Sequence, residues 1–279
     1  PNAQTPAQLY HQMALSDWSP WHTYSNYKNW HVDYGIPYDK YINGRNLQMW
    51  DRVQDERVLL CVRHLMLTET RANLGFAQEP EDRLHYVPLE DLTKEQYNRV
   101  LKDKILGTDR EEILCDTSAK LRAVLHMLEG GVTKNVTLDF KNDKVVKHED
   151  FIVLANNEKV AYIKEHWGDS EDVAIMYHYR AEKIKLESHF EHAQILQATT
   201  NAEGTDLQHT KHLVIYSQDW STSKHTQRRC RQANRARTDP IIVHFLLVKD
   251  AISEEVYNTV AINKQNYVDS LFNKTQLGY

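Results

Sequence analysis

The sequence predicts an α/β fold: a RecA-like parallel sheet flanked by helices, preceded by a mainly helical N-terminal region. From residue 156 onward, short apolar runs alternate with helical segments, the pattern of a parallel sheet covered on both faces. The first third is rich in tryptophan and tyrosine and lacks this alternation. A chain of 279 residues suffices for one large or two modest domains. We expect a division into residues 1–107 and 108–279.

The N-terminal region is expected to be helical. Its many aromatic side chains are more often used for packing than for binding a ligand. Thr93 followed by Gln96 has the spacing of a capping box, which predicts that a helix begins at Thr93. The elements predicted in this region are helices at 8–14, 25–32, 46–67 and 93–105, and an extended segment at 86–89.

The remaining elements follow from apolar spacing and from turn residues. A helix at 118–128 is closed by Gly130 and Gly131. Residues 132–146 resemble a hairpin with a turn at Asn142 and Asp143. Beyond this, the sequence predicts helices at 157–167, 181–190, 223–234 and 253–272, and strands at 173–178, 195–198, 212–217 and 241–248.

Composition excludes several classes of protein. The net charge of −5 does not fit a generally basic nucleic-acid binder, so such a contact has to use a local patch. The three cysteines are far apart, which fits a reducing cytoplasm. No apolar stretch approaches the roughly 18 residues that span a membrane, and no signal peptide is recognisable. The 15 histidines have no convincing metal-ligand spacing, so no metal site is expected.

An arginine cluster is the most informative stretch. It contains Arg228, Arg229, Arg231, Arg235 and Arg237 and no acidic residue. Arginine is suited to planar, bidentate recognition of phosphate. The cluster is therefore either a phosphate-directed group, acting as an ATP-sensing finger or a nucleic-acid contact, or a solvated basic helix face.

A second cluster follows the predicted strand at 195–198. Thr199, Thr200 and Asn201 precede a turn at Gly204 and Asp206. Hydroxyls and backbone amides at a strand end suit phosphate or sugar contacts, although a plain structural loop is the alternative. Because both clusters follow strands, we expect both at the carboxyl edge of the sheet, where such folds bind ligands.

Taken in order, these motifs resemble the C-terminal lobe of Swi/Snf-type, superfamily-two helicases or DNA translocases, especially those of bacteriophages. That family has a G-x-[N/D]-L turn, a strand, an Asp-Trp pair and a Q-x-x-x-R helix. The N-terminal PNAQTPAQLY is similar to the end of the family's first lobe, so we expect the chain to follow that lobe. Motif four is assigned to 173–178, with 151–155 as a rival. The matching elements here are Gly204-Thr205-Asp206-Leu207, residues 212–217, Asp219-Trp220, and Gln227 with Arg231.

The resemblance implies a role for each site residue. Arg231 would reach the ATP γ-phosphate, and Arg235 would replace the family's second arginine, whose position holds Asn234. The implied nucleotide-side residues are Gln227, Glu203, Gly204 and Asp206. The implied nucleic-acid contacts are Thr199, Thr200, Asn201 and Arg228.

The resemblance also implies a function. No G-x-x-x-x-G-K-[ST] or D-E-x-[H/D] motif is present, so ATP and Mg²⁺ would be held mainly by the first lobe. The expectation is the C-terminal half of an ATP-dependent helicase or translocase, inactive alone as an ATPase. We expect it to be monomeric, to act on DNA in the cytoplasm of a bacterial or phage-infected cell, and to have no membrane partner. The alternative is a non-catalytic binding module that uses the helix from Arg228 to Arg237.

Overall fold

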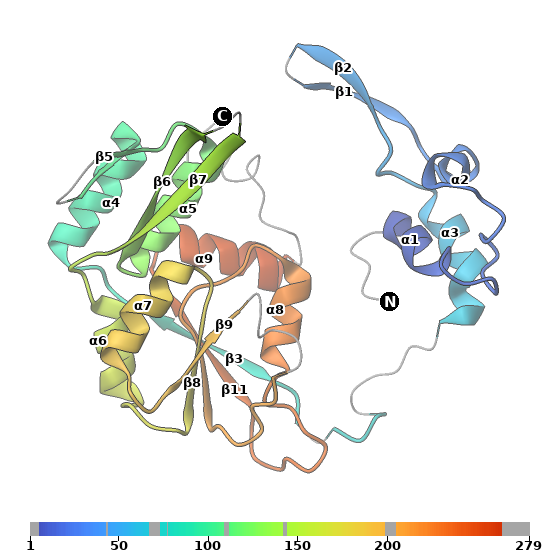
Figure 1. Ribbon diagram of the computed structural model, residues 1–279. Coiled ribbons are helices and arrows are strands. Elements are labelled where there is room, and N and C mark those ends of the chain that lie inside the picture. The colour runs from blue at the N-terminus through green and yellow to red at the C-terminus, as the bar shows by residue number, and fades with distance from the viewer. Residues whose placement is uncertain are drawn as a thin grey trace. The chain divides into compact units, whose positions relative to one another are not determined.

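The structure is a computed structural model that describes residues 6–42, 44–66, 73–76, 78–108, 112–141, 144–198 and 205–263 (Figure 1). The chain divides into two compact units, Pro1–Leu74 and Gly75–Tyr279. None of the described helices is both long and apolar enough to cross a membrane.

The first unit combines short helices with one hairpin. Its core is built around Trp21 and Trp30, which are fully buried. The side chain of Asn26 accepts a hydrogen bond from the Asn29 amide and so caps α2. Its elements are η1 (Pro6–Gln8), α1 (Leu9–Met13), α2 (Tyr27–Tyr34), β1 (Tyr38–Ile42), β2 (Arg45–Met49), α3 (Asp55–Val62) and η2 (Arg63–Leu65).

The hairpin corrects one prediction. A helix at 46–67 is wrong in its first half, because Arg45–Met49 forms β2 and pairs antiparallel with β1. Ile42 pairs with Arg45, which leaves a two-residue Asn-Gly connection at 43–44. Gly44 has φ of 80°, a conformation that favours glycine, and Asn-Gly is a strong hairpin signal.

The second unit is built on a five-stranded sheet in the order β3-β11-β10-β8-β9. All neighbouring strands are parallel, which confirms the predicted α/β fold with a parallel sheet flanked by helices. The strand β8 of this sheet contains 173–177, whereas residues 151–153 belong to a hairpin. The strands are β3 (Glu81–Tyr86), β8 (Val173–Tyr177), β9 (Gln194–Gln197), β10 (His212–Ile215) and β11 (Ile242–Leu247).

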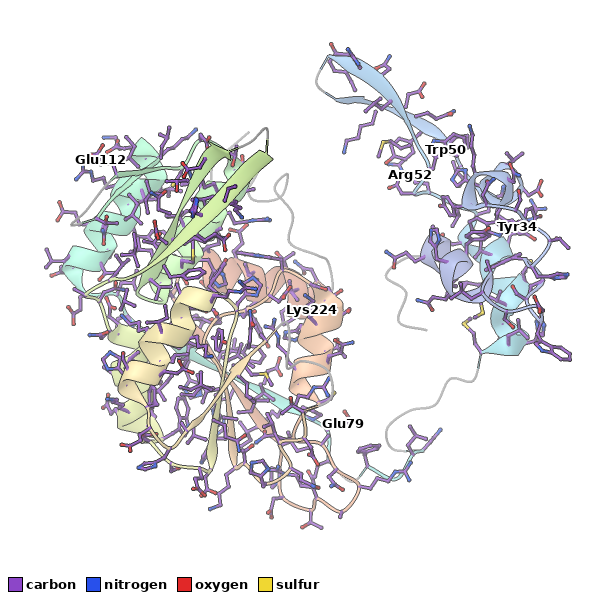
Figure 2. All side chains as sticks on the ribbon, viewed as in Figure 1. Tyr34, Trp50, Arg52, Glu79, Glu112 and Lys224 are labelled. Carbon is purple, nitrogen blue, oxygen red and sulfur yellow. The ribbon has the colours of Figure 1, made fainter. Side chains whose placement is uncertain are left out.

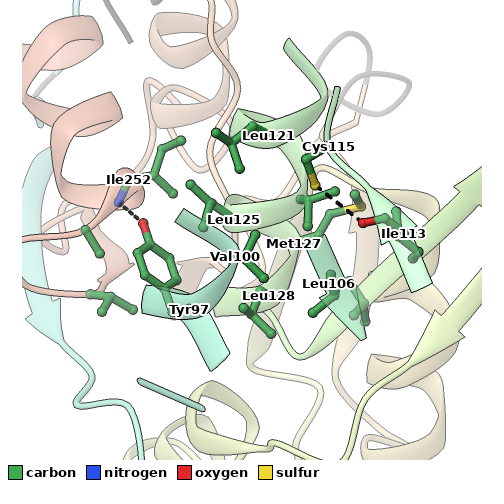
Figure 3. Close-up of a cluster of buried hydrophobic side chains, with 14 of the residues drawn as sticks. Tyr97, Val100, Leu106, Ile113, Cys115, Leu121, Leu125, Met127, Leu128 and Ile252 are labelled. Carbon is green, nitrogen blue, oxygen red and sulfur yellow. Dashed lines mark hydrogen bonds between the residues drawn. The ribbon is translucent and has the colours of Figure 1, made fainter. Parts of the chain in front are cut away.

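Helices and two hairpins surround this sheet. Val160, Ile163 and Leu186 from α6 and α7 pack on one face. A further cluster joins α4, α5 and α9, where the Ile252 amide donates to the Tyr97 hydroxyl at 3.1 Å (Figure 3). These elements are α4 (Asp91–Asp103), β4 (Ile105–Gly107), β5 (Glu112–Leu114), α5 (Ser118–Glu129), β6 (Val132–Lys141), β7 (Lys144–Val153), α6 (Glu158–His166), α7 (Arg180–His189), α8 (Thr222–Arg229), α9 (Ile252–Tyr257) and a π-helix (Asn258–Ile262).

Two helix predictions need correction, and a third is tested only as far as residue 263. The helix α4 begins at Asp91, so Thr93 lies inside it and is buried, and the Gln96 side chain instead donates to the Gly107 carbonyl. The helix predicted at 223–234 ends at Arg229. The helix predicted at 253–272 ends at Tyr257 and continues as the π-helix, and residues from 264 onward lie outside the described part.

The strand β3 lies in the region that the sequence assigned to the helical part. It pairs with β11 along its whole length, and the chain divides by contacts after Leu74. The expected division at 107/108 stays a prediction about functional domains.

Candidate functional site: the arginine segment

The arginine segment, residues 228–237, lies at the amino edge of the sheet. The helix α8 starts beyond the carboxyl end of β10 and carries the chain back along the sheet. Arg229 Nη2 donates to the Pro80 carbonyl at 2.7 Å, just before β3. The Gln78 side chain donates to the carbonyl of Thr238 at 2.9 Å. The expectation that these arginines lie at the carboxyl edge is therefore wrong for Arg229 to Arg237, because α8 intervenes between the strand end and these residues. The side chain of Arg228 reaches back to Asp219, which follows the carboxyl end of β10.

Arg228 is buried in an ion pair. Only 3% of its side chain is exposed, and its Nη2 donates to Asp219 Oδ2 at 3.1 Å. Lys224 Nζ and His178 Nδ1 lie 3.6 and 3.5 Å from the same oxygen (Figure 2). Burial lowers the pKa of Arg228 to about 10, although Asp219 opposes this shift. A nucleic-acid contact by Arg228 would require this pair to open.

Arg229 fastens α8 to the edge strand β3. Its Nε donates to Asp82 Oδ1. The other oxygen of Asp82 accepts the Tyr257 hydroxyl at 2.7 Å, and His225 Nε2 lies 3.8 Å from it. Asp82 thereby ties β3 to both α8 and α9, which gives Arg229 a structural role.

Arg237 and Gln232 connect the segment to the start of β10. Arg237 Nη1 donates to the Thr210 carbonyl at 3.2 Å. The buried Gln232 donates through Nε2 to the same carbonyl at 2.9 Å. The Leu207 amide donates to the Arg231 carbonyl at 3.1 Å. The structure thus brings Leu207, the last residue of the Gly204–Leu207 motif, against the arginine segment.

Arg231 and Arg235 differ from the other three arginines. No residue in the described part of the chain makes a hydrogen bond or ion pair to either guanidinium group. Arg231 is half-buried, and its Nε is inaccessible and without a partner, as are the Nε atoms of Arg228 and Arg237. Arg235 is exposed and lies over the Phe76 ring at 5.9 Å. A partly desolvated cation without a partner is unfavourable unless an anion reaches it.

The other predicted site residues are less informative. Gln227 is half-buried in α8. Asp206 is exposed and its Oδ1 accepts the Gln208 amide at 3.0 Å. Within the described ranges, no group of three or more His, Cys, Asp or Glu side chains is placed to hold a metal ion. Thr199, Thr200, Asn201, Glu203 and Gly204 lie outside the described residues.

A buried polar cluster at the carboxyl edge was not predicted from the sequence. Glu182 Oε2 accepts the amides of His178 and Tyr179 at 3.0 and 2.9 Å and the Ser217 hydroxyl at 2.5 Å. Burial raises the pKa of Glu182 and lowers the pKa of His178 to about 4. A glutamate at the third position of a helix is the available signal, because such a side chain can cap that helix. Glu182 is fully buried, so it orders α7 against β8 and β10 without meeting a substrate.

A second charged pair lies in the same interior. Lys159 Nζ is 3.9 Å from Glu129 Oε2, and neither side chain has any exposed surface. Burial lowers the pKa of Lys159 and raises that of Glu129. Because neither side chain has exposed surface, this pair belongs to the interior of the fold and not to a surface site.

Comparison with known proteins extends to the fold only. No protein-family model matches the sequence, and no curated protein matches it. A solved structure of the C-terminal part of the Fun30 ATPase domain is similar, with a TM-score of 0.45 and 10% sequence identity. The alignment covers 71% of this chain and 96% of that one.

Proposed function

We propose that this chain is the second motor lobe of an ATP-dependent nucleic-acid translocase or helicase. The observation that supports the proposal is that the arginines of the segment differ in whether they have a partner within the fold. Three arginines are bound within the fold, whereas Arg231 and Arg235 have no hydrogen-bonded or ion-paired partner in the described chain. The order of motifs around them resembles that of Swi/Snf-type motors.

The two arginines would act on a nucleotide held elsewhere. A guanidinium group stabilises the charge that develops on a transferring phosphoryl group. The sequence has no phosphate loop, so a first lobe would bind ATP and Mg²⁺. A finger of this kind need not lie at the carboxyl edge of its own sheet, because its target belongs to the other lobe.

The backbone hydrogen bond between Leu207 and Arg231 suggests how nucleic-acid binding and ATP hydrolysis are coupled. In the proposal, Thr199, Thr200 and Asn201 contact the nucleic-acid backbone, and Glu203, Gly204 and Asp206 continue toward the nucleotide side. Gln227 orients the end of α8. Closure and opening of the two lobes during ATP hydrolysis would then move the protein along DNA.

A binding module without catalysis is the alternative. The same exposed Arg235 and half-buried Arg231 would then hold an acidic partner, and no lobe with a phosphate loop would accompany the chain. The gene region before Pro1 distinguishes the two, because a motor requires a phosphate loop and a D-E-x-H-type motif there in frame.

The test is ATP turnover by the motor assembled from this chain and the lobe bearing the phosphate loop. Arg231→Ala should lower DNA-stimulated turnover by roughly 10³-fold while ATP and DNA still bind, because a finger acts mainly in the transition state. Arg235→Ala should have a similar effect if it supplies the second finger. Arg99→Ala, an exposed arginine of α4, is the matched control. Unchanged turnover in both the Arg231 and Arg235 variants would rule out the motor proposal.

A further inference from the structure

The β1–β2 hairpin projects from the helices of the first unit (Figure 1). It is a two-stranded sheet by itself. Tyr41 is 72% exposed and Leu47 is 47% exposed. An isolated hairpin is at best marginally stable in water, so a surface of this kind gains from a partner.

The base of the hairpin is firmly held. The Ile36 amide donates to the Arg52 carbonyl at 2.9 Å, and the Tyr27 hydroxyl donates to the Trp50 carbonyl at 2.5 Å (Figure 2). At Gly35 an added Cβ would lie 1.9 Å from His31 Nδ1, so only glycine fits where the chain enters the hairpin. The ribbon is therefore presented in a defined direction relative to α2.

The pairing register separates two kinds of side chain. Directly paired residues of antiparallel strands share a face. Lys40 pairs with Leu47, and Ile42 with Arg45, which places both cations on one face. Tyr41 pairs with Asn46 and Asp39 with Gln48 on the other face. From residue 40 to residue 50 the sequence KYINGRNLQMW contains no acidic residue.

We propose that this hairpin is a contact for double-stranded DNA and enters its major groove. That groove is about 12 Å wide and admits a two-stranded ribbon. With the amide face toward the groove floor, Asn46 and Gln48 suit base edges. Lys40 and Arg45 lie on the opposite face, so their long side chains would reach around the strand edges to the phosphates of the groove walls. We choose DNA over an acidic protein because of the proposed function. The presence of a cationic face follows from the pairing register alone.

The groove geometry also selects DNA over duplex RNA. The major groove of A-form RNA is too deep and narrow for side chains to read. A ribbon that depends on groove entry should therefore bind duplex DNA more tightly than duplex RNA of the same sequence and length.

The experiment measures fluorescence anisotropy of a labelled 30-base-pair DNA duplex with the 279-residue chain at several salt concentrations. Lys40→Ala/Arg45→Ala should weaken binding by about tenfold at low salt and reduce the salt slope by about 2, since two phosphate contacts are lost. Lys94→Ala/Lys102→Ala removes two exposed charges from α4 and should leave both quantities unchanged. Gly44→Val keeps the charge but strains the turn at φ of 80°, and should also weaken binding.

Equal affinities for the wild type and for both hairpin variants would overturn the proposal. So would equal losses on the matched RNA duplex, or no nucleic-acid binding by the wild type, which would favour an acidic protein partner. If the hairpin variants bind DNA normally while Arg231→Ala abolishes ATP turnover, only the hairpin proposal fails. If the hairpin variants weaken DNA binding while ATP turnover is unchanged in both the Arg231→Ala and Arg235→Ala variants, only the motor proposal fails.

Discussion

Arg228 illustrates at the residue scale why a charged cluster has to be sorted by burial. Its partner Asp219 is 7% exposed, so removal of the guanidinium would leave a carboxylate in the interior with weaker pairing. Breaking a buried pair in this way costs about 3–5 kcal/mol. Arg228→Ala should therefore lower the urea midpoint of unfolding strongly, whereas Arg235→Ala, which removes an exposed side chain, should not. Equal midpoints for the two variants would contradict the buried pair.

At the level of single residues, the sequence predicts this site only in part. The run of arginines is plain, and its preference for phosphate follows from the guanidinium group. The sequence does not show which arginines are available to a ligand, because Arg229 is bound by Asp82, 147 positions away. Asn234 stands where the family that the chain resembles has its second arginine, and its side chain is hydrogen-bonded to Gln208, 26 positions away.

Three adjacent strands carry a row of histidines at the element scale. His85 Nε2 lies 2.9 Å from His244 Nδ1, and His212 Nδ1 lies 3.4 Å from His244 Nε2. Burial and the neighbouring rings lower the pKa of His244 to about 3, and burial also lowers the pKa values of His85 and His212. Arg83 lowers the pKa of His244 further, whereas Asp172 raises that of His212.

These depressed pKa values predict acid sensitivity. The unfolded chain takes up protons near pH 6.5 that the folded strands do not, so stability is full above pH 6.5 and falls as the pH drops toward 3. Across the pH range between its unfolded and folded pKa values, His244 contributes a slope of about 1.4 kcal/mol per pH unit. His244→Gln should reduce the slope of the unfolding free energy against pH, between pH 6.5 and 5, by about the 1.4 kcal/mol per pH unit that one proton contributes. His192→Gln, at an exposed position, is the control, and an unchanged slope in His244→Gln would contradict the prediction.

The elements divide into those set by local pattern and those set by distant contacts. Apolar runs were enough to predict β8, β10 and β11, and α5 was predicted correctly because its apolar spacing ends at Gly130 and Gly131. The end of α8 was not predicted correctly, because Gln232 lies beyond the helix and its side chain donates a hydrogen bond to the Thr210 carbonyl. The β1–β2 hairpin was missed although its Asn-Gly turn is a local signal, because the aromatic-rich surroundings suggested helices.

The whole molecule has two separate cores. Val58 is fully buried in the first unit and Val214 in the second. Because each unit has its own core, calorimetry should show two unfolding transitions. Val58→Ala creates a cavity costing about 2 kcal/mol, which should lower one transition by about 10 °C. Val214→Ala should lower only the other, and a single transition shifted by both variants would show that the units unfold together.

The pairing of β3 with β11 also bears on how the protein is made. His85 on β3 meets His244, 159 positions later. At a synthesis rate of about 5–20 residues per second, the early strand waits roughly 8–30 s on the ribosome before its neighbour emerges. An unpaired strand is an aggregation hazard during such a delay. The strand reads EDRLHY, with three charged residues among six, and charges at this density oppose the aggregation of an unpaired strand while translation supplies the partner.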